Sequence, residues 1–198
     1  MKRTSLLLLS LLLAVSTFAG EPLTDADRDK LVAYLDKTSA AFLGSVDGLT
    51  EAQWNYRAAE GRWTIAEVVE HVAAGEKMLL GMTVDAMKQP TAADVLADAR
   101  KDEMVLSRIP DRGTKFKAPE PLIPTNRFQS PAAAVEAFKA ERAESLKLAR
   151  TGGDLRAFAA KGPAGNLDVY GWLLFVSAHS ERHTKQIEEV KADAGFPR

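Results

Sequence analysis

The sequence contains no cysteine in 198 residues. This absence excludes disulfide bonds, thiolate metal ligands and a cysteine nucleophile, so side chains that carry oxygen or nitrogen must perform any chemistry. Histidine is also scarce, with three residues. Charge of one sign is not in excess: the formal net charge is −1, and no basic stripe is interleaved with aromatic residues. We therefore expect no nucleic-acid partner.

Long hydrophobic runs are confined to the N-terminus. Lys2 and Arg3 precede an apolar run over residues 6–15, and Thr17-Phe18-Ala19 form a small-x-small cleavage site. This pattern predicts a signal peptide over residues 1–19 that is cleaved, which leaves residues 20–198 as a single exported domain, periplasmic or extracellular. The alternative is an uncleaved anchor, but the run is shorter than the roughly 20 residues that span a bilayer, so we expect no stable membrane anchor. Cleavage would change the net charge from −1 to −3.

Helical periodicity dominates the remaining sequence, and no stretch alternates in the manner of a strand. Four long helices are predicted, each beginning at a residue type that caps helix N-termini. One cap belongs to a T-x-x-E capping box, and another is a Ser-Pro pair. The first predicted helix begins at residue 24 and is ended by Gly44 and Gly48, and the other three span residues 64–87, 130–150 and 168–192. The caps are Thr24, Thr64, Ser130 and Asp168. The predicted fold class is all-α, a four-helix bundle with one long crossover connection.

The connections are less regular. A short helical turn is expected from Thr50, one or two helical pieces over residues 91–109, and a glycine-containing loop over residues 154–166. Residues 110–130 contain prolines at positions 110, 119, 121 and 124, which predicts an extended segment. We interpret this segment as a surface crossover between distant helix ends. The alternative is a lid or wall of a site, a common role of long loops.

The three histidines lie on two of the long helices. His71 is in the run TIAEVVEHVAAGEKM, and His179 and His183 are in AHSERHTKQIEEVK. Residues four apart share one helix face, so His179 and His183 can present two imidazoles to one point. Both histidine-bearing stripes also carry the apolar residues of their helices. If the two helices pack together, three neutral nitrogens converge and can bind a divalent metal.

Simpler interpretations remain for each histidine, since a single one on a helix is more often structural. The HSERH run also lacks the glutamate that follows the first histidine in HExxH metalloproteases. Glu181 would point roughly 100° or more away from both neighbouring histidines, so it is not assigned as a base. The catalytic residues therefore remain unknown. Glu67 and Gln186 are candidates to orient the histidines, although the capping box alone explains Glu67.

The runs EGRWTIAEVVEHVAAGEKML and WLLFVSAHSERHTKQIEEVK resemble the two signature helices of the DinB-like superfamily. The intervening SRIPDRGTKFKAPEPLIPTNRFQSPAAAVEAFKAER extends this resemblance to the superfamily's metal-binding branch. The resemblance implies a four-helix bundle with a histidine-based divalent metal centre, in which His71 is one ligand and His179 and His183 are the other two. Zn, Ni, Fe(II) or Mn would suit three imidazoles. Three protein ligands leave a coordination position for water or substrate.

The resemblance also implies an activity, in which the metal activates a small thiol that attacks an electrophile. An exported protein meets few such thiols, so hydrolysis by metal-activated water is the exported counterpart. We therefore expect a metal-dependent transferase or hydrolase that acts on a small electrophile. One alternative is a non-catalytic module that binds a metal or small ligand. Another is a bundle that acts by oligomerising, for example as a homodimer.

A few further residues bear on a substrate site. Arg62 and Arg127 are candidates for contact with an anionic substrate. Trp63 and Trp172 could line a pocket, but we expect core packing for both, since large aromatic side chains are mostly buried.

Overall fold

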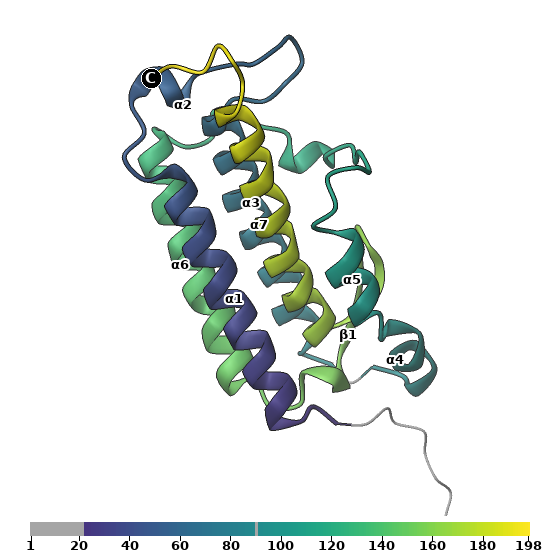
Figure 1. The fold of residues 1–198 in the computed structure, drawn as a ribbon. Helices are drawn as coiled ribbons and strands as arrows, with labels where there is room; N and C mark the ends of the chain where they lie inside the picture. Colours follow the sequence, from purple (N-terminus) through teal and green to yellow (C-terminus); the bar gives the residue numbers. More distant parts are fainter. Residues whose placement is uncertain (1–21, 90) are drawn as a thin grey trace, which may run out of the picture.

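Four long helices form a bundle in the computed structural model, which describes residues 22–89 and 91–198 (Figure 1). Helices α1 and α7 run in one direction, and α3 and α6 run in the opposite direction. Around the bundle, α7 packs between α1 and α3, and α6 packs against both α3 and α1. Because α3 and α6, which are consecutive among the four long helices, are parallel, the chain between them must return along the whole bundle. This confirms the predicted four-helix bundle with one long crossover. The helices are α1 (Asp25–Val46), α3 (Ile65–Ala86), α6 (Pro131–Thr151) and α7 (Val169–Lys191).

The long helices begin where the sequence predicts. Thr24, Thr64, Ser130 and Asp168 are the N-caps, and each side chain accepts a hydrogen bond from a backbone N–H of the first turn. Gly44 and Gly48 were predicted to end the first helix, and α1 ends between them at Val46. A glycine inside a helix costs about 1 kcal/mol, and burial of Phe42 and Val46 outweighs this cost.

Short elements occupy the connections. The two pieces predicted before residue 110 are α4 (Ala93–Ala99) and α5 (Asp102–Arg108), and Thr50 caps α2 (Glu51–Trp54). The proline-rich segment is extended except for the 3₁₀ turn η1 (Glu120–Leu122).

The prediction of a loop over residues 154–166 was wrong. After the 3₁₀ turn η2 (Leu155–Ala157), strands β1 (Ala159–Gly162) and β2 (Gly165–Asp168) form an antiparallel hairpin. Gly165 has a φ of 89°, a conformation that glycine adopts without strain.

The bundle interior is mostly apolar. Leu35, Phe42, Phe138 and Trp172 are fully buried, and the Trp172 indole N–H donates to the Ala160 carbonyl at 2.9 Å. Core packing was predicted for Trp172. The interior also holds an ion pair between Arg142 of α6 and Glu76 of α3, whose side chains are 2% and 1% exposed.

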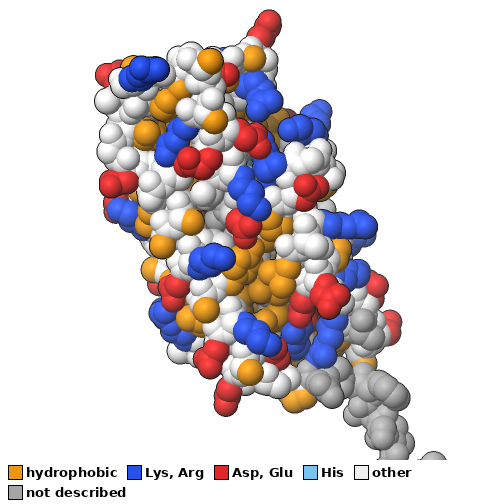
Figure 2. All heavy atoms as spheres, viewed as in Figure 1, with side chains coloured by type: hydrophobic (Ala, Val, Ile, Leu, Met, Phe, Trp, Pro, Cys, Tyr) orange, Lys and Arg blue, Asp and Glu red, His pale blue; other side chains and the backbone are white. Residues whose placement is uncertain are grey.

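The surface is mixed in charge. On the face drawn in Figure 2, acidic and basic side chains are interspersed, and hydrophobic side chains are gathered near its middle. Among the described residues, no helix is long and apolar enough to span a membrane. The predicted signal peptide lies outside the described residues, so cleavage and export remain predictions.

Candidate metal centre

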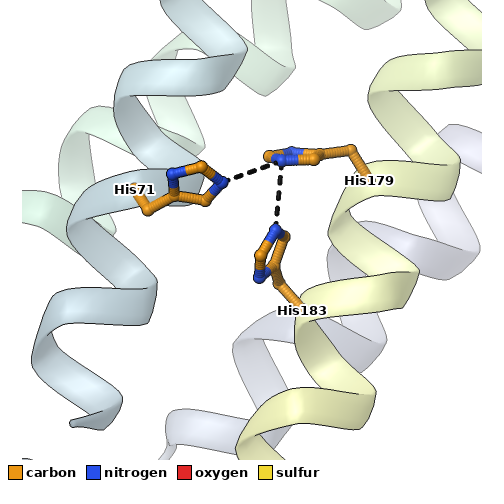
Figure 3. Close-up of side chains that lie close together, drawn as sticks. All are labelled: His71, His179 and His183. Carbon is orange, nitrogen blue, oxygen red and sulfur yellow. Dashed lines mark hydrogen bonds between the residues drawn. The ribbon is translucent and has the colours of Figure 1, made fainter. Parts of the chain in front are cut away.

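The three histidines meet where α3 and α7 pack together. His71 lies two turns into α3, and His179 and His183 lie on consecutive turns of α7. His71 and His183 are buried, 3% and 6% exposed, whereas His179 is partly exposed. The Nε2 atom of His179 lies 3.1 Å from the Nε2 atoms of both His71 and His183 (Figure 3). The structure therefore brings together all three residues that the sequence singled out.

The other ring nitrogens have fixed partners. Nδ1 of His71 lies 2.9 Å from the Leu122 carbonyl oxygen, which can only accept, so this Nδ1 carries the proton. Nδ1 of His183 lies 2.9 Å from Oε1 of Gln186. An Arg112 guanidinium nitrogen lies 3.4 Å from the same Oε1, which identifies that atom as the amide oxygen. Both rings are therefore in the tautomer that leaves Nε2 with a free lone pair.

This arrangement fits a divalent cation. The lone-pair Nε2 atoms of His71 and His183 each lie 3.1 Å from Nε2 of His179, and one proton on His179 cannot bond well to both neighbours. Two nitrogens bound to one metal at about 2.05 Å with tetrahedral angles lie about 3.3 Å apart. The observed separations are close to this value. Three imidazoles are also a donor set that suits Zn, Ni, Fe or Mn.

Burial keeps the imidazoles neutral, which is the form that binds metals. Removal from water lowers the pKa of His71. Burial, together with the neighbouring histidines, lowers the pKa values of His179 and His183 well below the ordinary value. The site therefore does not favour imidazolium ions.

A glycine on α3 leaves room for the His179 ring. A Cβ atom added to Gly75 of α3 would lie 3.1 Å from Cε1 of His179, tighter than most real contacts. The ring thus occupies space left by the missing side chain. Gly75 lies one turn after His71 on α3 and leaves room there for the His179 ring of the neighbouring helix.

A cavity of about 1040 Å³ opens onto the three histidines. Its lining includes residues 111, 112, 114–119 and 122 of the crossover connection. The interpretation of this segment as a simple surface crossover was therefore wrong, because it also forms a wall of the cavity. Arg182 holds the wall in place by donating to the carbonyls of Ile109, Asp111 and Thr114.

A second clamp holds the part of the connection that contacts His71. The Glu70 carboxylate accepts from the Thr125 N–H at 2.6 Å and from Arg127 Nε at 2.9 Å. Arg127 in turn donates to the carbonyls of Pro121 and Ile123, on either side of Leu122. Glu70, the residue before His71, thus fixes the carbonyl that orients His71. Sequence reasoning missed this clamp and Leu122, because a backbone acceptor has no residue signature.

The remaining predicted residues divide between the site and the scaffold. Glu67 completes the capping box and pairs with Arg57 rather than with a histidine. Glu181 accepts from the Tyr34 hydroxyl at 2.8 Å. Arg62 lines the cavity.

One prediction about these residues was wrong. Arg127 is engaged by Glu70 instead of facing the cavity. Trp63 packs against the hydrophobic core, as predicted, and it also lines the cavity, with its ring centroid 4.9 Å from that of His71.

Replacing Gln186 with leucine is expected to weaken metal binding by about 10–100-fold, because the Nδ1–H of His183 loses its acceptor. Competition with a chromogenic chelator would measure the dissociation constant. Gln129→Leu, at an exposed position, is the matched control and should leave the affinity unchanged. Equal affinities for both variants would show that Gln186 does not orient His183.

Comparisons with known proteins agree with this fold. No curated protein matches the sequence. Among solved structures, the chain is similar to YfiT from Bacillus subtilis, described as a probable metal-dependent hydrolase with an unusual four-helix bundle topology. The TM-score is 0.62 at 18% identity, over 90% of this chain and 93% of that one. The family model of the DinB superfamily matches residues 34–187, a range that includes all three histidines. The chain therefore belongs to the DinB superfamily.

Proposed function

We propose that His71, His179 and His183 bind one divalent transition metal through Nε2, and that the protein uses this metal to hydrolyse a small electrophile. The convergence of three Nε2 atoms on the floor of an open cavity carries the proposal. A metal held in this way polarises a carbonyl group and lowers the pKa of a coordinated water toward neutrality. The description of YfiT as a probable metal-dependent hydrolase supports the same class of reaction.

The protein groups around the site bind, orient and exclude water. The Leu122 carbonyl and Gln186 fix two imidazole rings, and the Phe175 ring stacks on His179 with centroids 6.0 Å apart and planes 13° apart. Trp63 covers His71. These contacts leave the rings little freedom to rotate, so the nitrogens are preorganised for a metal.

Hydrolysis is favoured over thiol transfer by the predicted signal peptide. If residues 1–19 are cleaved and residues 20–198 are exported, the protein works where water is abundant and small thiols are scarce. The absence of cysteine means that the chain supplies no thiol of its own. Water is then the nucleophile that requires no further reactant.

A non-catalytic metal-binding module is the second candidate, and one observation favours it. Asp111 is the one acidic residue that lines the cavity within the described part of the chain. Its carboxylate accepts from the backbone N–H groups of Gly113 and Thr114 and from the Thr114 hydroxyl. These bonds lower the pKa of Asp111 and keep its oxygens engaged. A hydrolase at this site would rely on the metal rather than on a carboxylate base.

The first test is metal content. The protein from residue 20 onward is expected to hold about one equivalent of a transition metal by mass spectrometry, and a His179→Ala, His183→Ala variant is expected to hold none. A Lys185→Ala, Glu188→Ala variant, changed at exposed positions of the same helix, is the control. A parent that stays metal-free after reconstitution would exclude both candidates.

Activity then separates the two candidates. The loaded protein is assayed against ester, amide and lactone panels, with and without added thiol. Turnover without thiol that disappears with a chelator supports the hydrolase. Turnover only with thiol indicates transferase chemistry instead. A loaded protein that turns over none of these substrates, with or without thiol, is the binding module.

A further inference from the structure

The cavity next to the histidines is lined by positive charge. Although the whole chain has a net charge of −1, its lining contains six arginine or lysine residues and a single acidic residue, Asp111. The basic residues come from the loop before α3, from α5, from the crossover connection and from α7. They are Arg62, Arg108, Arg112, Lys115, Lys117 and Arg182.

Three of these basic residues hold the structure together, but nearby carboxylates neutralise their positive charge only in part. Arg182 donates to backbone carbonyls and lies 4.8 Å from the Phe116 ring centroid, but pairs with no carboxylate in the described chain. Burial and the nearby Arg112 lower the pKa of Arg182, which indicates mutual repulsion. Arg112 and Arg62 share one carboxylate, that of Glu189, at 2.8 and 3.6 Å.

The other three charges have no such role. Arg108, Lys115 and Lys117 are exposed at the cavity. Within residues 22–89 and 91–198, no side-chain hydrogen bond or ion pair engages any of them. Lys115 is close enough to Glu189 to help lower the pKa of that carboxyl, but Glu189 already pairs with Arg112 and Arg62. Cations that outnumber the acidic groups around a cavity create a positive potential, which low-dielectric walls focus and which attracts anions.

We propose that the cavity recognises a small molecule that carries a carboxylate or phosphate group, with Arg108, Lys115 and Lys117 as the residues that bind the anion. This assignment names the substrate class of the proposed hydrolase and rests on that proposal for the reacting end of the molecule. A volume of about 1040 Å³ is large enough for an anionic group and a separate electrophilic group in one ligand. Arg108, Lys115 and Lys117 bind the anionic group, and the electrophilic group lies next to the histidines.

The test uses the chelator-treated protein from residue 20 onward, so that no bound metal contributes to anion binding. Isothermal titration calorimetry compares inorganic phosphate and short mono- and dicarboxylates with the primary amides of the same acids. The expected result is measurable binding of at least one anion and about tenfold weaker binding of its neutral amide. An Arg108→Gln, Lys115→Gln, Lys117→Gln variant is expected to lose about tenfold in anion affinity, in proportion to three exposed charge contacts.

A Lys77→Gln, Lys88→Gln, Lys147→Gln variant removes the same charge at exposed positions that do not line the cavity, and it should bind like the parent. Equal losses in the two triple variants would overturn the proposal, because net charge alone would then explain them. Equal binding of acid and amide, or no binding of any anion, would also overturn it. The His179→Ala, His183→Ala variant separates the two proposals. If this variant still binds the acid more tightly than the amide, the assignment of the anion site is supported even if metal loading of the parent has failed.

Discussion

Replacing Arg142 with methionine is expected to lower the free energy of unfolding by about 3–5 kcal/mol, the largest effect anticipated for one substitution in this protein. Arg142 donates to both oxygens of Glu76, and also to the Leu35 carbonyl and the Thr38 hydroxyl at 2.9 Å. Ser180 donates to Glu76 at 3.1 Å. Because both charged side chains are buried, removal of the arginine leaves a carboxylate without its counter-ion and without access to water.

The loss should depend on pH in a defined direction. Burial raises the pKa of Glu76, and Arg142 opposes this rise. Without Arg142, the folded-state pKa of Glu76 lies further above its unfolded value. A raised acid pKa contributes stability below the unfolded value, and this contribution is lost as pH rises through the folded value. The variant should therefore be less impaired at pH 5 than at pH 8.

Urea unfolding of the parent and variant at both pH values would measure this loss. Arg150→Met is the matched control, because Arg150 lies on the same helix and pairs with Asp36 at 3.4 Å with both side chains half exposed. We expect it to cost less than about 1 kcal/mol. A Glu76→Met, Arg142→Met variant should recover most of the loss, because it buries no unpaired charge. A double variant as unstable as Arg142→Met would show that the arginine acts through Leu35 and Thr38 instead.

The buried pair also shows what sequence reasoning can and cannot predict. The capping residues Thr24, Thr64, Ser130 and Asp168 placed all four helix starts, because a cap is a local signal. The bundle followed from the spacing of apolar residues, and the three histidines followed from their helix faces. Arg142 and Glu76, in contrast, look like ordinary surface charges of amphipathic helices. Only the packing of α3 against α6 makes their burial visible.

The features that were missed depend on long-range contacts. Strands β1 and β2 are four residues each, too short for an alternating pattern, and the Ala159 N–H is bound by Thr91 at 2.9 Å. Arg182 holds the crossover connection against the cavity by donating to backbone carbonyls. Because every residue has a backbone carbonyl, the sequence does not show which ones accept. The same reason hid Leu122, the acceptor of His71. Local patterns thus located the three histidines and Gln186, which contacts His183, but not the Leu122 carbonyl that orients His71.

Metal binding is expected to stabilise the parent strongly and the His71→Ala variant weakly. A ligand that binds only the folded state adds about 4 kcal/mol at a thousandfold excess over its dissociation constant. The three nitrogens converge only when α3 is packed against α7, so the unfolded chain offers no comparable site. Loss of His71 leaves two ligands on α7 and removes the link between the helices. The gain in its free energy of unfolding should then fall below about 1 kcal/mol at the same metal concentration.

Thermal and urea unfolding with and without Zn, Ni, Mn or Fe(II) would measure these gains, and a chelator should reverse them. Each variant is compared with its own metal-free form, because His71→Ala also leaves the Leu122 carbonyl without its donor. Lys77→Ala, at an exposed position of the same helix, should retain the full gain of the parent. A gain of equal size in His71→Ala would place the metal elsewhere on the protein. A gain confined to chains with all three histidines would mean that the metal ties α3 to α7 at the floor of the cavity.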